Sequence, residues 1–193
     1  MVVARVGVLA LQGDFARHAE ALRRADAEPV EVRRVAELDA LGGLIVPGGE
    51  STTLLNLMRD EPWFEELRAF HGRGGALFGT CAGVILLARE VANPPQPSLG
   101  LLDAAVERNA FGRQVDSFEA RLSAPELGGA VEAVFIRAPR FRSLGPGVDV
   151  LARLGDEPAL VRQGRILAGT FHPELTADDT IHRYFVQMTA EHR

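Results

Sequence analysis

The stretch Ala76-Leu-Phe-Gly-Thr-Cys-Ala-Gly83 predicts a buried strand that turns sharply into a helix. Residues 76–78 are apolar, and residues 83–89 are typical of a helix. Cys81 lies at the turn between them, with a glycine two positions away on each side. A strand-to-helix turn of this kind strains the residue at its tip and leaves room only for very small neighbours. The pattern fits a cysteine nucleophile, and it also fits a buried structural cysteine packed beside glycines.

Outward from this unit, the first half of the chain alternates short apolar runs with helical patterns. This order favours a parallel sheet with helices on both faces. The expected strands of this half are residues 6–9, 30–33, 44–46 and 76–78, and the expected helices are residues 14–25, 53–59, a segment from Pro62 onward, and 83–89.

The second half has strand-like runs joined by short glycine-containing turns, which favours antiparallel hairpins. Residues 93–98 have the composition of a surface loop, and a final helix carries Ile181, Phe185 and Met188 on one face. We therefore expect one domain over residues 1–193, with an α/β fold of three layers. Its open sheet is expected to be mostly parallel, covered by helices on both faces, with additional antiparallel strands in the second half. The strand candidates of this half are residues 105–108, 118–122, 131–137, 148–154, 159–162 and 166–170.

Composition excludes several kinds of chemistry. All 21 basic residues are arginine, so a lysine Schiff base and a Walker-type phosphate lysine are impossible. Cys81 is the single cysteine of the 193 residues, which excludes an internal disulfide and a multi-thiolate metal site. The net charge of −5 argues against a nucleic acid or an anionic membrane as partner. No secretory signal or membrane-length apolar run occurs, so we expect a cytoplasmic protein.

His172 is the candidate base for a thiol nucleophile. It follows the expected strand 166–170 in the segment Thr170-Phe-His-Pro-Glu174, at a strand end where parallel-sheet sites are built. Pro173 stiffens the backbone between His172 and Glu174, so the carboxylate can hold the imidazole in one tautomer. Taken alone, the segment also fits a turn with a surface histidine and a solvated glutamate.

The other histidines show no such context. His18 and His71 are expected on exposed helical stretches, His182 lies in the last helix, and His192 lies in the tail. No two histidines have ligand spacing with Cys81, so we expect no metal site. No cofactor is expected either.

The segment Pro47-Gly-Gly-Glu-Ser-Thr52 follows the expected strand 44–46. Paired glycines let the backbone approach a ligand and can turn an amide inward, as one half of an oxyanion hole. The same residues fit an ordinary turn with Ser51 or Thr52 as the cap of the following helix. Because the carboxyl ends of parallel strands share one edge of a sheet, we expect Cys81, His172 and Gly49 to converge.

Together these motifs resemble the class I, triad-type glutamine amidotransferases, and more closely the glutaminase subunit of pyridoxal 5′-phosphate synthase. The resemblance extends from about residue 6 to residue 188. It rests on Val8-Leu-Ala-Leu-Gln-Gly13, Pro47-Gly-Gly-Glu-Ser-Thr-Thr53, Gly79-Thr-Cys-Ala-Gly83, Glu107-Arg-Asn-Ala-Phe-Gly-Arg-Gln114, Ser117-Phe-Glu119, Phe135-Ile-Arg-Ala-Pro139 and Phe171-His-Pro-Glu-Leu-Thr176.

The resemblance implies hydrolysis of L-glutamine to glutamate and ammonia, with ammonia passing to a separate, lyase-type synthase subunit. It makes Cys81 the nucleophile, His172 the general base and acid, and Glu174 its orienting group. It also implies an oxyanion hole from the amides of Gly49 and Ala82, and a supporting role for Gln12 at the partner interface. The substrate-binding residues that it implies are Gly49, Glu50, Ser51, Arg108, Ile136 and Arg137.

Two alternatives belong to different classes. One is an enzyme on the same scaffold, either a glutaminase subunit that serves another acceptor or a γ-glutamyl hydrolase. The other is a non-catalytic regulatory subunit with a degenerate site, although every position of the triad is filled.

Overall fold

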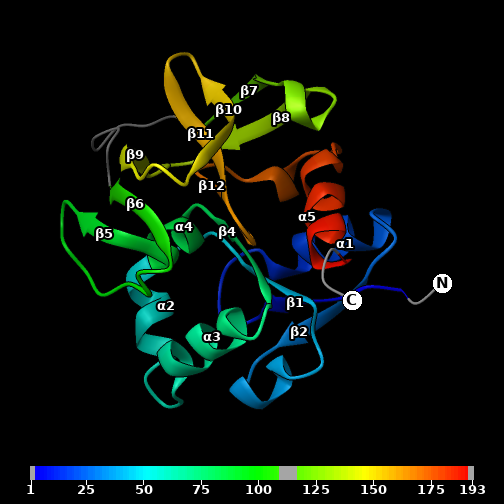
Figure 1. The fold of residues 1–193 in the computed structure, drawn as a ribbon, viewed down its shortest axis with the longest axis vertical. Helices are drawn as coiled ribbons and strands as arrows, with labels where there is room; N and C mark the ends of the chain where they lie inside the picture. The colour runs from blue at the N-terminus through cyan, green and yellow to red at the C-terminus, as the bar shows by residue number, and fades with distance from the viewer. Residues whose placement is uncertain (1–2, 109–116, 191–193) are drawn as a thin grey trace.

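The computed structural model describes residues 3–108 and 117–190 and places nine strands in one mixed sheet. The order is β2-β1-β3-β4-β12-β11-β10-β7-β8; the first five strands run parallel and the others pair antiparallel. The expected α/β class, with a parallel sheet from the first half and antiparallel strands from the second, is confirmed (Figure 1). The strands of this sheet are β1 (Arg5–Leu9), β2 (Glu28–Val32), β3 (Gly43–Val46), β4 (Ala76–Thr80), β7 (Phe118–Ala124), β8 (Gly129–Phe135), β10 (Asp149–Leu154), β11 (Glu157–Gln163) and β12 (Ile166–Gly169).

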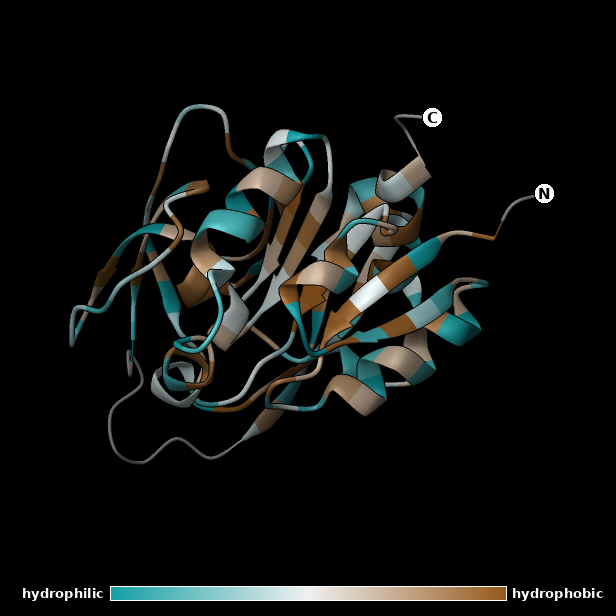
Figure 2. Ribbon diagram, turned by 90° about the horizontal axis from the view of Figure 1, so that it is seen from below, coloured by the Kyte–Doolittle hydropathy of each residue, from teal (hydrophilic) through white to brown (hydrophobic). Residues whose placement is uncertain are grey.

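Helices cover both faces of the parallel half. Consecutive residues of β3 point to opposite sides, so Leu44 and Val46 join one hydrophobic core and Ile45 joins the other. The first core lies under α2, α3 and α4, and the second lies under α1 and α5, which are neighbours in Figure 1. Figure 2 shows the apolar strand segments between these layers of helices. The helices are α1 (Phe15–Arg24), α2 (Ser51–Leu57), α3 (Trp63–Gly72), α4 (Ala82–Leu87) and α5 (Thr180–Ala190), with short 3-10 turns η1 (Val35–Leu38), η2 (Pro125–Leu127) and η3 (Pro173–Leu175).

A second, three-stranded sheet was not expected from the sequence. It consists of β5 (Ala88–Ala92), β6 (Leu102–Glu107) and β9 (Arg140–Leu144) in the order β5-β6-β9. The predicted helix over residues 83–89 is therefore wrong at its end, because the helix stops at Leu87 and the chain continues as β5. β9 was not predicted because its arginines alternate with other residues and leave no apolar run. Its pairing partner β6 is also distant in sequence.

The register of the sheet positions the candidate site. Val46 of β3 pairs with Gly79 of β4, and Gly169 of β12 pairs with Thr80 of β4. These three neighbouring parallel strands thus end together, and the loops that follow them share one edge of the sheet. No helix within the described residues is long and apolar enough to cross a membrane.

Candidate active site

The turn between β4 and α4 holds Cys81 in a conformation that non-glycine residues rarely adopt. Cys81 has φ +48° and ψ −104° and is 7% exposed. A Cβ on Gly79 would lie 2.7 Å from the backbone of Gly83, and a Cβ on Gly83 would collide with the carbonyl oxygen of Val46. Both glycines are therefore required for the close approach of β3, β4 and α4. The strained turn expected from the sequence is present.

His172 and Glu174 lie on the loop that follows β12. Nδ1 of His172 is 2.8 Å from Oε1 of Glu174, and both side chains are buried. The backbone N–H of His172 donates to the carbonyl of Val134 on β8 at 2.8 Å, which fixes the start of this loop. Pro173 and Glu174 belong to the turn η3, so the proline sets the angle between the two side chains.

The structure brings His172 and Cys81 together on either side of Gly48. A Cβ on Gly48 would collide with Cε1 of His172 and would lie 3.1 Å from Cβ of Cys81. Burial alone would lower the pKa of His172, but hydrogen bonds to Cys81 and Glu174, together with their charges, raise it to about 10. The imidazole is therefore held in its protonated form between a sulfur and a carboxylate.

Gln12 holds the loop after β3 through two hydrogen bonds. Its Nε2 donates to the carbonyl of Gly48 at 3.3 Å, and its Oε1 accepts from the amide of Glu50 at 3.2 Å. Gly49, between them, has φ +137°, and a Cβ there would collide with Oε1 of Gln12. The backbone conformation favours glycine at this position, and a side chain there would also displace the amide of Gln12.

Glu50, rather than Ser51 or Thr52, is the cap of α2. Its carboxylate accepts hydrogen bonds from the amides of Thr52 at 3.0 Å and Thr53 at 2.7 Å. Desolvation would raise the pKa of Glu50, but these hydrogen bonds lower it to about 2. Ser51 instead donates through its hydroxyl to Oε1 of Gln96 at 2.9 Å, which ties the loop of residues 93–98 to the site.

A cavity of about 300 Å³ opens beside Cys81 and His172. It is lined by all six residues that the resemblance implied for substrate binding: Gly49, Glu50, Ser51, Arg108, Ile136 and Arg137. Ile85 and Pro139 also line it and were not singled out from the sequence. Ala82, Glu174 and Gln12 lie outside its lining: Ala82 and Glu174 are buried behind the cysteine and the histidine, and Gln12 lies behind the glycine loop.

The two arginines of the cavity differ in their surroundings. Arg108 is mostly buried, with Nη2 3.3 Å from Oγ1 of Thr52 and 3.7 Å from Oε1 of Glu50. Arg137 follows β8 with φ +41°, and it is exposed. The motif quoted from Glu107 to Gln114 continues beyond Arg108 into residues 109–114, which lie outside the described part of the chain.

The expectation that His18 is exposed is wrong. His18 of α1 is fully buried, as is His182 of α5, and the two rings lie 3.0 Å apart between Nδ1 of His18 and Nε2 of His182. Nε2 of His18 lies 3.3 Å from Oε2 of Glu174. Burial would raise the pKa of Glu174, but His18 and His172 lower it. The signal that could have revealed this burial is Leu22, four residues after His18 and so on the same helix face.

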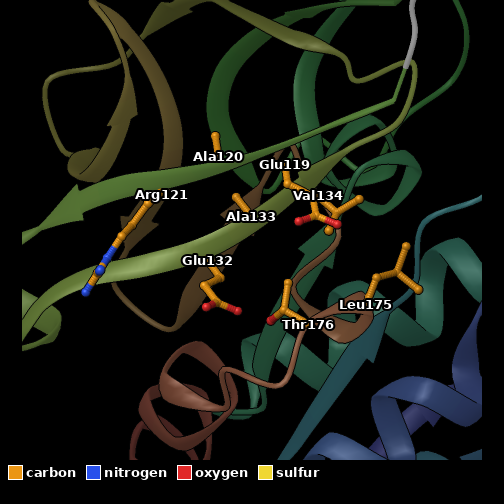
Figure 3. Close-up of a pocket in the computed structure, with 8 residues that line it drawn as sticks. All are labelled: Glu119, Ala120, Arg121, Glu132, Ala133, Val134, Leu175 and Thr176. Carbon is orange, nitrogen blue, oxygen red and sulfur yellow. The ribbon is translucent and has the colours of Figure 1, made fainter.

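A second cavity, of about 470 Å³, lies between the β7–β8 hairpin and η3. Glu132 and Thr176 point toward one another across it from the hairpin and the loop (Figure 3). It contains neither Cys81 nor His172, so it is separate from the converging site.

The chain matches the SNO glutamine amidotransferase family over residues 8–191. It belongs to this family. The resemblance to glutamine amidotransferases is thereby confirmed, together with the enzyme class that it implied.

Two relatives align with this chain along nearly the whole length of both sequences. The pyridoxal 5′-phosphate synthase subunit PdxT of a Thermus thermophilus strain is 61% identical over 185 residues, covering 95% of this chain and 96% of the relative. The protein of the same name from Deinococcus radiodurans is 54% identical over 191 residues, covering 96% and 97%.

Solved structures share the fold. A crystal structure described as a glutamine amidotransferase superposes with a TM-score of 0.91 at 58% identity, covering 96% of this chain and 98% of the other. A putative GMP synthase subunit from Thermoplasma acidophilum, at 17% identity, has a TM-score of 0.73 over 100% of this chain and 97% of its own. The second likeness concerns the fold alone.

Proposed function

We propose that this chain hydrolyses L-glutamine to L-glutamate and ammonia through Cys81, His172 and Glu174, and delivers the ammonia to a pyridoxal 5′-phosphate synthase subunit. One observation carries the proposal: the strained Cys81 lies next to the buried pair His172 and Glu174. Within this pair, Nδ1 of His172 is 2.8 Å from Oε1 of Glu174. The name shared by the 61% and 54% identical relatives supports the assignment of the partner.

The reaction is an acyl transfer in two steps. The Cys81 sulfur attacks the side-chain carbonyl carbon of glutamine, a C–S bond forms, and the oxyanion accepts hydrogen bonds from the amides of Gly49 and Ala82. His172 gives its proton to the departing nitrogen, the C–N bond breaks, and ammonia leaves. His172 then takes a proton from water, the new hydroxyl group displaces the sulfur, and the thioester is cleaved to glutamate.

Arg108 and Arg137 are the groups suited to the α-carboxylate of glutamine. A guanidinium offers two parallel donors that match a carboxylate, and both arginines line the cavity that reaches Cys81. Glu50 stays ionised because of its hydrogen bonds, so it offers a negative charge to the α-ammonium group. The volume of about 300 Å³ suits one amino acid.

The partner acts on the peptide between Gly48 and Gly49. Gln12 holds the Gly48 carbonyl and the Glu50 amide, so this side chain fixes the present direction of the Gly49 N–H. Glycine allows the peptide to rotate at little cost when the partner docks. Since the chain has no lysine, imine chemistry on sugar phosphates belongs to the synthase subunit.

The test is a glutaminase assay of the purified chain with and without a candidate synthase subunit. We expect low activity alone, a higher rate with the partner, and complete loss in Cys81→Ala, whose stability to urea stays that of the wild type. Turnover retained in Cys81→Ala contradicts the mechanism. Equal rates with and without the partner contradict the activation step, and capture of a different acceptor enzyme in a pull-down contradicts the pathway.

A further inference from the structure

His18 lies where two parts of the site meet. Its ring is fully buried, and Nε2 lies 3.3 Å from Oε2 of Glu174 and 3.3 Å from Oγ1 of Thr80. Its other nitrogen, Nδ1, lies 3.0 Å from Nε2 of His182. A helix on one face of the sheet thereby reaches the carboxylate that orients His172.

The negative charge of Glu174 favours one arrangement of protons. Glu174 is ionised and only accepts, so the neutral His18 ring carries its hydrogen on Nε2, which lies 3.3 Å from Oε2 of Glu174 and forms its hydrogen bond with the hydroxyl of Thr80. Nδ1 of His18 is then an acceptor, and the hydrogen between the two rings belongs to Nε2 of His182. Nδ1 of His182 consequently carries no hydrogen, and it has no hydrogen-bond partner among the described residues.

Thr80 links His18 to the glycine loop that contains Gly48. Its hydroxyl oxygen accepts from the amide of Gly48 at 3.0 Å while lying next to Nε2 of His18. His18 therefore adjoins the carboxylate of the triad on one side and, through Thr80, the peptide segment of the oxyanion loop on the other.

We propose that His18, held by His182, is a positioning residue that fixes the carboxylate of Glu174 and so the orientation of His172. This inference rests on the proposed glutaminase function. Two neutral histidines in a solvent-free core lose their hydration, and apolar side chains would fill the same space without that cost. The N–H that His18 places 3.3 Å from the buried Oε2 of Glu174 accounts for a polar group at this position.

The electrostatic surroundings of Glu174 come from several elements. His18 and His172 act on Glu174 directly. Asp14, at the start of α1, acts on His18, and Cys81 acts on His172. Arg24 of α1 and Asp178, before α5, act on His182. Removing the His18 N–H leaves Oε2 of Glu174 buried without this polar neighbour, so Glu174 takes up a proton at a higher pH.

The experiment compares two amide replacements in the full chain with its synthase subunit. In His18→Gln the amide nitrogen reaches the place of Nε2 and still presents an N–H beside Glu174, whereas in His18→Asn the shorter amide reaches only the place of Nδ1. Phe185→Leu is the control for lost stability, because Phe185 packs in the same core against Phe78 and contacts no site residue by hydrogen bond.

We expect His18→Asn to lower kcat about tenfold or more with KM unchanged, and to move the acid limb of the pH–rate profile up by about one pH unit. His18→Gln and Phe185→Leu should keep the wild-type limb. If His18→Asn has the wild-type profile, or if all three variants lose activity equally without a shift of the limb, the proposal is overturned.

A second readout does not depend on turnover. Because Cys81 is the single cysteine, its alkylation by iodoacetamide reports on this site alone. The rate at pH 7 should fall severalfold in His18→Asn and stay unchanged in His18→Gln and Phe185→Leu. If the wild type has no glutaminase activity but His18→Asn still labels more slowly, the proposed function is overturned and the positioning role is kept. If the wild type is active and His18→Asn has the wild-type labelling rate and pH profile, the positioning role alone is overturned.

Discussion

His18 and His182, 164 residues apart in the chain, face each other across 3.0 Å in a core that excludes solvent from both rings. Burial is the main cause that lowers the pKa of both groups below 6.5, to about 3 for His182. Two neighbouring helices thus carry a neutral histidine pair at physiological pH, and protonation of either ring works against folding.

This pair makes stability sensitive to mild acid. A histidine whose folded pKa is lowered contributes stability above its unfolded pKa of 6.5 and loses it as the pH falls from there toward the folded value. For His182, whose folded pKa is about 3, the loss at pH 5 amounts to about 2 kcal/mol. We expect the free energy of unfolding, measured with urea, to fall between pH 7 and pH 5, and to fall less in His182→Leu.

Other groups do not obscure this window. His172 has a raised pKa, so its contribution is fully present below pH 6.5 and is lost only as the pH rises toward 10. Glu174 and Glu50 have lowered pKa values and lose their contribution below about pH 4.5. Phe185→Leu is the control, since it weakens the same core with no change in the pH slope; the wild-type slope in His182→Leu contradicts the assignment.

Gly83, two residues after Cys81, is expected to control stability as well as the site. Gly83→Ala places a Cβ against the carbonyl oxygen of Val46, and backbone cannot move aside as a flexible side chain can. We expect a loss of about 1–3 kcal/mol or more in urea unfolding. Gly72→Ala, at the end of α3 with nothing within 4 Å, is the matched control and should be neutral or slightly stabilising. Equal stability of the two variants argues against close packing at the turn.

The parts of the site that lie within a few residues of each other could be predicted from the sequence. The strand, turn and helix around Cys81 and the spacing of His172 and Glu174 are local, and the alternation of strands and helices placed both at one sheet edge. What escaped prediction depends on distant partners. β5 and β9 form strands only because β6 lies between them, and His18 looks like any polar helix residue until α5 covers it.

Glu50 shows a different limit. The sequence places a helix start near Ser51, but three neighbouring residues can cap a helix, and the choice depends on the backbone angles of the glycine loop before it. Gln12, which sets that loop, is 38 residues away from Glu50. Resemblance to a family supplied Gln12 as a site residue; periodicity alone would have left it as the end of a strand.

The carboxylate of Glu174 is expected to need both of its oxygens. Oε1 lies 2.8 Å from Nδ1 of His172 and Oε2 lies 3.3 Å from Nε2 of His18, and a carboxamide would turn an NH2 group toward one of these two N–H groups. Glu174→Gln should therefore lower kcat by roughly 10²-fold or more, yet less than Cys81→Ala, because the nucleophile stays in place. Glu132→Gln on β8 is the matched control with no expected effect. A wild-type kcat in Glu174→Gln removes Glu174 from the mechanism.

Arg108 is expected to affect binding more than chemistry. Its guanidinium lies at the wall of the Cys81 cavity, within 3.3 Å of Oγ1 of Thr52, where two parallel donors can meet the α-carboxylate of glutamine. Arg108→Lys keeps the charge and loses the paired donors, so we expect KM to rise about tenfold or more, with kcat within threefold of the wild type.

The control for this change is Arg153→Lys, because Arg153 donates to the carbonyl of Asp156 on the surface and lies outside the cavity lining. Steady-state glutaminase kinetics of the two variants with the synthase subunit separate the roles. If KM in Arg108→Lys equals that of Arg153→Lys, the carboxylate binds elsewhere. If kcat falls and KM does not, Arg108 acts on the reacting amide instead, since an interaction made only in the transition state lowers kcat alone.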